Sequence, residues 1–227
     1  DLDRVQSVAQ AADVVVLVVG YTDADEGEFI EPAVFQEMTA MFPPPTPEEM
    51  AAAQTFVAAM STSEAVAMPP GGDRDQLTLR PEDEALIQMV SAVQPRTIVA
   101  IMSGSAVIME AWREKVAAIL MIWYPGMEGG HALADILLGK INPSGKLPFI
   151  IPKSAEDLPF FDKEASEIIY DLGHGYRKLE REAIAPAFPF GFGLSYTGYS
   201  YANLKLSQSQ LYPSDVLKVG LDATNIG

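Results

Sequence analysis

The run DVVVLVVG at residues 13–20 constrains the fold more than any other part of the chain. Its apolar residues are continuous rather than alternating, and they are bounded by an aspartate and a glycine. Such a run predicts a strand that is buried on both faces, as strands inside parallel sheets are. Apolar residues recur at helical spacing over residues 2–12, so a short amphipathic helix is expected to precede the strand.

A loop crowded with acidic residues follows this strand and is the first candidate site. Its acids are Asp23, Asp25, Glu26 and Glu28, and Gly27 allows the backbone to turn sharply beside Glu26. In open α/β sheets, ligands bind at the carboxyl ends of the strands. The alternative interpretation is a solvated acidic turn without function, and the residues alone leave both open.

Beyond the loop, helix-like and strand-like segments alternate. We expect helices over 81–93, 106–116 and 131–138, and strands over 96–102, 118–123 and 147–151. This alternation predicts the α/β class, as a three-layer sandwich with a mostly parallel sheet and helices on both faces. An excursion over 31–70, with a predicted helix at 47–60, interrupts the pattern and is interpreted as a flap or insertion.

The end of the chain changes to a β pattern. Residues 152–189 are irregular, and strands are expected at 199–201, 204–206 and 216–222. An immunoglobulin-like sandwich needs ~7 strands over ~100 residues, so the segment 196–227 is interpreted as an incomplete β-sandwich. Its unpaired strand edges predict that the isolated chain is poorly soluble or forms a homo-oligomer.

Composition excludes several classes of function. A formal net charge of −16 disfavours nucleic acid and anionic membrane surfaces as partners and favours a neutral ligand. The chain has no cysteine, which excludes disulfides and thiolate chemistry. No apolar run approaches the ~18 residues of a membrane span. No signal peptide is evident, and a cytoplasmic location is favoured over secretion.

Two short motifs could indicate a serine nucleophile and a phosphate-binding turn, but the spacing of their residues supports neither function. Ser103-Gly104-Ser105 follows a predicted strand, but it is not a G-x-S-x-G nucleophile elbow, and His131 and His174 show no triad spacing. The glycine-rich turn 126–130 has neither of the common phosphate-binding spacings, and Glu128 within it would repel an anion.

Several stretches, in order along nearly the whole chain, resemble the second and third domains of family 3 glycoside hydrolases, especially bacterial β-glucosidases. The most specific are WYPGMEGG at 123–130 and NPSGKLP at 142–148; the others are residues 12–20 with 25–28, 71–74, 103–105, 134–139 and 188–196. The resemblance implies a six-stranded α/β sandwich over 1–195 and the start of a fibronectin type III-like domain over 196–227. It implies no cofactor and no metal.

The same resemblance implies retaining hydrolysis of terminal β-D-glucosyl residues, with a β-glucoside or oligosaccharide as substrate. A retaining enzyme uses two carboxyl groups ~5–5.5 Å apart, one as acid/base and one as nucleophile. In the family the nucleophile is an aspartate on a preceding TIM-like barrel, which these 227 residues do not contain. The acid/base is a glutamate followed by glycine on the sandwich-domain loop. This selects Glu26, with Glu28 as the runner-up.

Three further expectations concern residues around that loop. Asp73 and Arg74 are substrate-binding candidates, although an ion pair that orders the base of the loop is favoured over direct sugar contact. Trp123, Tyr124 and His131 are candidates for the aglycone side, with core packing favoured for Trp123. The alternative function is a non-catalytic module that binds carbohydrate or a partner protein through the same surface.

Overall fold

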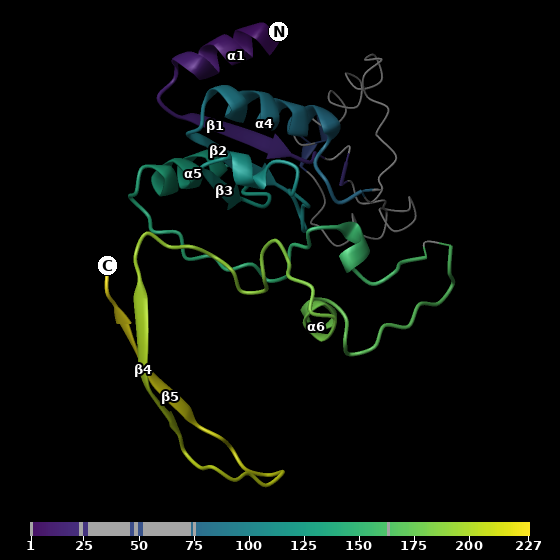
Figure 1. Ribbon diagram of the computed structural model, residues 1–227, viewed down its shortest axis with the longest axis vertical. Helices are drawn as coiled ribbons and strands as arrows, with labels where there is room; N and C mark the ends of the chain where they lie inside the picture. The colour runs from purple at the N-terminus through teal and green to yellow at the C-terminus, as the bar shows by residue number, and fades with distance from the viewer. Residues whose placement is uncertain are drawn as a thin grey trace. The chain divides into compact units, whose positions relative to one another are not determined.

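The computed structural model describes residues 2–22, 25–26, 46–47, 50–51, 74, 76–162 and 164–227 (Figure 1). The chain divides into two compact units, residues 1–124 with 153–155, and residues 125–152 with 156–227. The excursion 31–70, nearly all of the helix expected at 47–60, Glu28 and Asp73 lie outside the described residues. No helix in the described part of the chain is long and apolar enough to cross a membrane.

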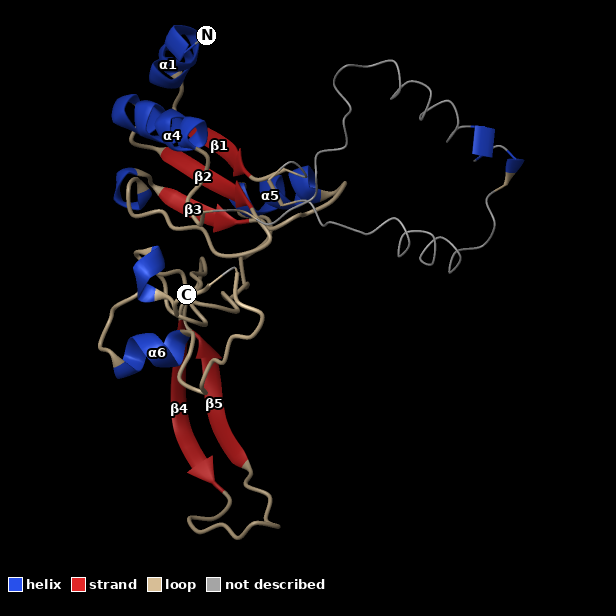
Figure 2. Cartoon of the chain, turned by 90° about the vertical axis from the view of Figure 1, so that its right-hand side faces the viewer, coloured by secondary structure: helices blue, strands red, loops and turns tan. Residues whose placement is uncertain are grey.

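The first unit is built on a parallel sheet of three strands in the order β1-β2-β3 (Figure 2). The strands are β1 (Val15–Gly20), β2 (Thr97–Met102) and β3 (Ala118–Met121). Val15 lies opposite Thr97, and Ile98 lies opposite Ala118. Because the strands are parallel, the residues that follow Gly20, Met102 and Met121 leave the same edge of the sheet. The predicted α/β class with a parallel sheet is confirmed.

Two helices pack on one face of this sheet. They are α1 (Leu2–Ala11) and α4 (Pro81–Val93), whose bounds match the predicted helices 2–12 and 81–93. Pro81 and three acidic residues begin α4, where the fixed proline φ and the positive helix end favour them. Ile87 and Val90 of α4 are fully buried.

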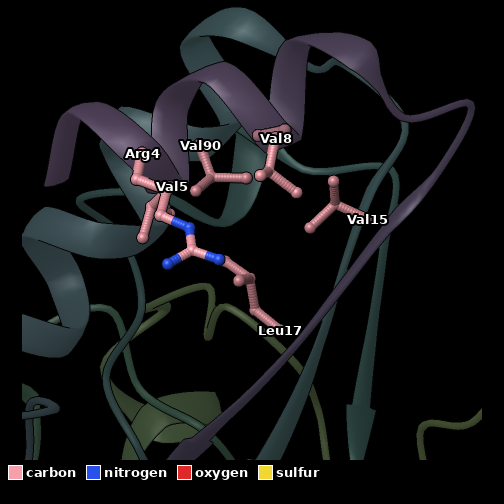
Figure 3. A pocket seen from close by; sticks show the side chains of 7 residues that line it. Arg4, Val5, Val8, Val15, Leu17 and Val90 are labelled. Atoms are coloured by element: carbon pink, nitrogen blue, oxygen red, sulfur yellow. The ribbon is translucent and has the colours of Figure 1, made fainter. Parts of the chain in front are cut away.

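An apolar hollow of about 250 Å³ lies between α1, α4 and the amino-terminal half of β1. Figure 3 shows the side chains of Val5, Val8, Val15, Leu17 and Val90 converging on it. Its lining holds one charged residue, Arg4, and the acidic loop leaves the other end of β1. The hollow is therefore a packing gap under α1 and not the candidate site.

The prediction that the first strand is buried on both faces is wrong. Val16 and Val18 of β1 are 41% and 54% exposed, whereas Val15 and Leu17 face the helices. Among the described elements, β1 is the edge strand of the three-stranded sheet, and α1 and α4 pack on one of its faces. The strand that is buried as predicted is the central one, β2, where Val99, Ala100 and Ile101 are fully buried.

Two other predicted elements are also wrong. Residues 106–116 form no α-helix: Ile108 instead bridges Thr78, and only a 3-10 turn, η1 (Arg113–Lys115), follows. Residues 147–151 form no strand, since Ile151 makes an isolated antiparallel bridge to Phe188. The described sheet of the first unit accordingly has three strands, where the resemblance implied six.

The second unit contains the remaining elements. These are α5 (Gly129–Leu137), η2 (Ala155–Asp157), α6 (Tyr176–Arg181), β4 (Tyr199–Leu206) and β5 (Val219–Asn225). The helix expected at 131–138 is confirmed as α5, while α6 lies in a stretch predicted to be irregular. β4 and β5 pair as an antiparallel hairpin in which every residue is exposed. The predicted poor solubility stays a prediction.

Two of the motifs behind the resemblance contact each other in this unit. The Asn142 side chain donates from Nδ2 to Ser195 Oγ at 2.8 Å, and its Oδ1 accepts from the Tyr196 amide at 2.8 Å. The Tyr196 hydroxyl donates to the Ile136 carbonyl at the end of α5, at 2.8 Å. These bonds tie the segment after residue 188 to the Asn142 turn and to the end of α5.

Candidate active site

The backbone that leads into the acidic loop is fixed at the end of β1. Gly20 has φ 139°, and a Cβ built on it would lie 2.0 Å from the Met102 carbonyl oxygen, so only glycine fits there. The Tyr21 amide donates to the same carbonyl at 2.9 Å. Burial raises the pKa of Tyr21, whose hydroxyl donates to the Thr78 carbonyl. The position at which the acidic loop begins, at the carboxyl end of β1, is therefore fixed.

Asp25 closes a tight turn directly after this point. Its Oδ2 accepts from the Thr22 amide at 2.9 Å and from the Thr22 hydroxyl at 3.0 Å, and it lies 3.7 Å from Arg80 Nη1. The Thr22 amide bond lowers the pKa of Asp25, with Arg80 adding to the effect. Asp25 thus has the role of a turn cap, which is the structural alternative considered for the acidic loop.

Glu26, which follows β1, points in another direction, into a cradle formed by Arg74 and by residues that follow β2 and β3. Its Oε1 lies 2.8 Å from Arg74 Nε, and its Oε2 accepts from the Gly104 amide at 2.9 Å and from the Tyr124 hydroxyl. The Glu26 side chain is 15% exposed. Gly104 comes after β2 and Tyr124 after β3, so the carboxyl edge of the sheet assembles the site, as expected for this class of fold.

Arg74 holds this cradle together. Its side chain is 8% exposed, donates to Ser105 Oγ and, at 3.2 Å, to the Ala106 carbonyl, and lies over the Tyr21 ring at 4.4 Å. The ion pair that orders the loop is therefore with Glu26. An Arg74–Asp73 pair lies outside the described residues. The substrate-binding role considered for Asp73 and Arg74 stays a prediction.

The other candidates have different surroundings. Ser103 is fully buried and donates to the Ser105 carbonyl at 2.9 Å, so it orders its own turn. His131, in the second unit, pairs with Glu128 at 2.7 Å through side chains that are more than 80% exposed. Trp123, for which core packing was favoured, is partly exposed and has φ 55°. Among the described residues, no group of three potential metal ligands exists.

Sequence reasoning missed Gly104 and Tyr124 as partners of Glu26, although it named both residues for other reasons. They lie 78 and 98 positions along the chain from Glu26. The available signal was that each follows a predicted parallel strand, and such positions share one edge of the sheet. Chemically, the site offers one well-held carboxyl group that can accept or donate a proton, and Asp25, the neighbouring carboxyl, is committed to its turn.

The contribution of Arg74 can be measured as stability. We expect Arg74→Ala to lower the free energy of unfolding by about 3 kcal/mol, because it leaves the mostly buried Glu26 carboxylate without its cation. Arg80→Ala is the matched control: Arg80 also pairs with acids of this region but is 36% exposed, so a loss of at most ~1 kcal/mol is expected. Urea unfolding measures both, and equal losses would contradict a special role for Arg74.

Comparison with known proteins supplies the family. The model of the glycosyl hydrolase family 3 C-terminal domain matches residues 1–196. A probable β-glucosidase I of Aspergillus fumigatus is 39% identical over 166 residues, and a β-glucosidase of Rhizobium radiobacter is 37% identical over 166 residues. Each alignment covers 69% of this chain and 20% of the relative, so the chain spans about a fifth of their length.

Solved structures agree with this assignment. A β-glucosidase from Streptomyces venezuelae in complex with D-glucose superposes with a TM-score of 0.71 at 26% identity, over 100% of this chain and 24% of that chain. β-Glucosidase 3B from Thermotoga neapolitana in complex with glucose gives a TM-score of 0.70 at 26% identity, over 100% and 27%. The resemblance seen in the motifs is confirmed: the chain belongs to glycosyl hydrolase family 3, whose C-terminal domain it contains.

Proposed function

We propose that this chain supplies the general acid/base of a retaining β-glucosidase, and that Glu26 is that residue. The observation that carries the proposal is the placement of Glu26, whose carboxyl group is held at the carboxyl edge of the sheet by Arg74, Gly104 and Tyr124. The sequence Glu26-Gly27 matches the acid/base pattern that the resemblance implies. Relatives named β-glucosidase support the substrate class, terminal β-glucosides or their oligosaccharides.

The proposed reaction needs a second carboxyl group. In the first step the Glu26 carboxylic acid gives its proton to the glycosidic oxygen while the nucleophile bonds to the anomeric carbon and the aglycone leaves. In the second step Glu26 takes a proton from water, whose oxygen bonds to the anomeric carbon and releases the nucleophile. Asp25 is committed to Thr22 and Arg80. Following the family that the sequence resembles, we assign the nucleophile to a barrel domain outside these residues.

A non-catalytic module that binds carbohydrate or a partner remains the second candidate. The observation in its favour is that the Glu26 side chain is only 15% exposed and has three partners, as a purely structural carboxylate also would. We also propose the domain division at 195/196, in which residues 196–227 begin a fibronectin type III-like domain. The β4–β5 hairpin is consistent with that reading.

The function is tested by hydrolysis of an aryl β-glucoside. Three proteins are compared: the 227-residue chain, a family 3 barrel alone, and the barrel fused to this chain. We expect activity only in the fusion, with the β-anomer of glucose released first, as NMR of the fresh product would show. Activity of the bare chain would place both carboxyl groups here and refute the division of roles. A barrel alone as active as the fusion would favour the non-catalytic module.

A further inference from the structure

The two oxygens of the Glu26 carboxyl group have different surroundings. A carboxylate offers about four lone-pair positions, two on each oxygen. Oε2 accepts both from the Gly104 amide, at 2.9 Å, and from the Tyr124 hydroxyl, so both of its positions are used. Oε1 has Arg74 Nε at 2.8 Å. Among the described residues, the position left open for proton transfer is therefore on Oε1.

An unusual backbone turn places Tyr124 beside this carboxyl group. The Ile122 amide still donates to the Ile101 carbonyl at 3.0 Å, which keeps residue 122 beside β2. Trp123 then takes φ 55°, a left-handed conformation that is uncommon for a bulky residue and is found where the surroundings impose it. At this turn the chain stops running beside β2, and the Tyr124 hydroxyl contacts Glu26.

Gly104 fits closely between the ring and the carboxyl group. A Cβ on Gly104 would lie 3.2 Å from Tyr124 Cε2 and 3.2 Å from Glu26 Oε2. The three groups therefore form one closely packed contact, in which the amide and the hydroxyl reach the same oxygen. This close approach of the Gly104 backbone to the Tyr124 ring holds the hydroxyl group beside Glu26.

We propose that Tyr124 is a positioning residue for Glu26: its hydroxyl and the Gly104 amide fix Oε2 and thereby present Oε1 for proton transfer. The proposal rests on the acid/base role proposed above for Glu26. Fixing one oxygen removes rotation of the carboxyl group, so the open lone pair keeps one direction throughout the reaction. Tyr124 itself neither gives nor takes the transferred proton.

The raised pKa of Tyr124 allows its hydroxyl to act as a permanent hydrogen-bond donor to Glu26. Burial of its hydroxyl, followed by the hydrogen bond to Glu26 and the charge of Glu26, raises the pKa of Tyr124 to about 12, against the opposing effects of the Gly104 amide and Arg74. The residue is 49% exposed as a whole, but its hydroxyl end lies against Glu26. The phenol therefore remains protonated throughout the neutral range and can donate to Oε2 there.

The first test uses leaving groups in the barrel fusion. Acid assistance matters for a poor leaving group and hardly at all for a good one. We expect Tyr124→Phe to lower kcat/KM for an alkyl β-glucoside about 10- to 100-fold, as expected for loss of a hydrogen bond to a charged group, and for 2,4-dinitrophenyl β-glucoside less than ~3-fold. Equal losses on both substrates would mean a merely structural role and overturn the proposal.

The second test needs no activity and uses the 227-residue chain. A difference absorbance titration between each protein and its Tyr124→Phe version isolates the Tyr124 phenol, with an expected midpoint at about 12. Glu26→Gln should move that midpoint down, because it removes the negative charge beside the hydroxyl. Asp25→Asn is the matched control and should leave it unchanged, since Asp25 faces Thr22 and Arg80. An unmoved midpoint in Glu26→Gln would overturn the contact.

The two proposals fail in different ways. If Glu26→Ala in the fusion retains full activity on the alkyl β-glucoside, the acid/base role of Glu26 is refuted, and the role of Tyr124 with it. If Glu26→Ala is impaired on that substrate but Tyr124→Phe is not, only the role of Tyr124 is refuted. A loss of kcat/KM in both variants that is confined to poor leaving groups supports both proposals.

Discussion

In a barrel-fused enzyme, Glu26→Ala is expected to lower kcat/KM for an alkyl β-glucoside about 10²- to 10⁴-fold, the usual contribution of general acid–base catalysis. The variant leaves the nucleophile intact but removes the proton donor for the aglycone. The aryloxide of an activated aryl glucoside leaves without that proton, so the first step on such a substrate should be nearly unaffected. The second step lacks its base, so the glycosyl-enzyme should accumulate and kcat and KM should fall together.

Azide provides the decisive measurement for this variant. Azide needs no base to attack the anomeric carbon, so adding it should restore kcat of Glu26→Ala on the aryl glucoside and yield β-glucosyl azide, with retained configuration. Glu28→Ala is the control, because Glu28 is the runner-up on the same loop, and a change of less than ~3-fold is expected, in keeping with no catalytic role. A large, azide-rescued loss in Glu28→Ala instead would move the acid/base to Glu28.

The elements that the sequence predicted well are those whose pattern is local. Pro81, the acidic first turn and the apolar spacing define α4 without reference to any other segment, and its bounds agree with the structure. The prediction of a helix at 106–116 is wrong because the conformation of this segment depends on a distant one. The Ile108 amide donates to the Leu77 carbonyl at 2.7 Å. That bond holds residue 108 extended, so a tertiary contact overrides helical spacing.

Burial could not be predicted from the valine run for a related reason. DVVVLVVG reads the same whether the strand is central or at an edge, and only the strand order shows that β1 is the edge strand. The site was predictable in part. Glu26 could be predicted from the loop and the resemblance. Its hydrogen bonds from Gly104 and Tyr124 could be predicted only by knowing that β2 and β3 are neighbours in the sheet.

The site's dependence on the sheet leads to a prediction at Gly20. Gly20→Ala is expected to lower the free energy of unfolding of the first unit by more than ~4 kcal/mol, since it combines overpacking with strain at a positive φ. The added Cβ would meet the Met102 carbonyl oxygen at 2.0 Å and the Met102 carbonyl carbon at 2.8 Å, which are backbone atoms of the neighbouring strand. φ 139° is also strained for any residue with a side chain.

The strands can relieve that clash only by separating where Gly20 lies opposite Met102. Separation would break the 2.9 Å bond from the Tyr21 amide to Met102 and move the ring over which Arg74 lies. The loss should therefore reach Glu26 as well as the sheet. Gly130→Ala is the control: Gly130 lies in α5 with nothing within 4 Å of its added Cβ, so stability should stay equal or rise by up to ~1 kcal/mol. Urea unfolding followed by circular dichroism compares the two, and a Gly20→Ala chain as stable as the control would mean that β1 does not approach β2 this closely at its end.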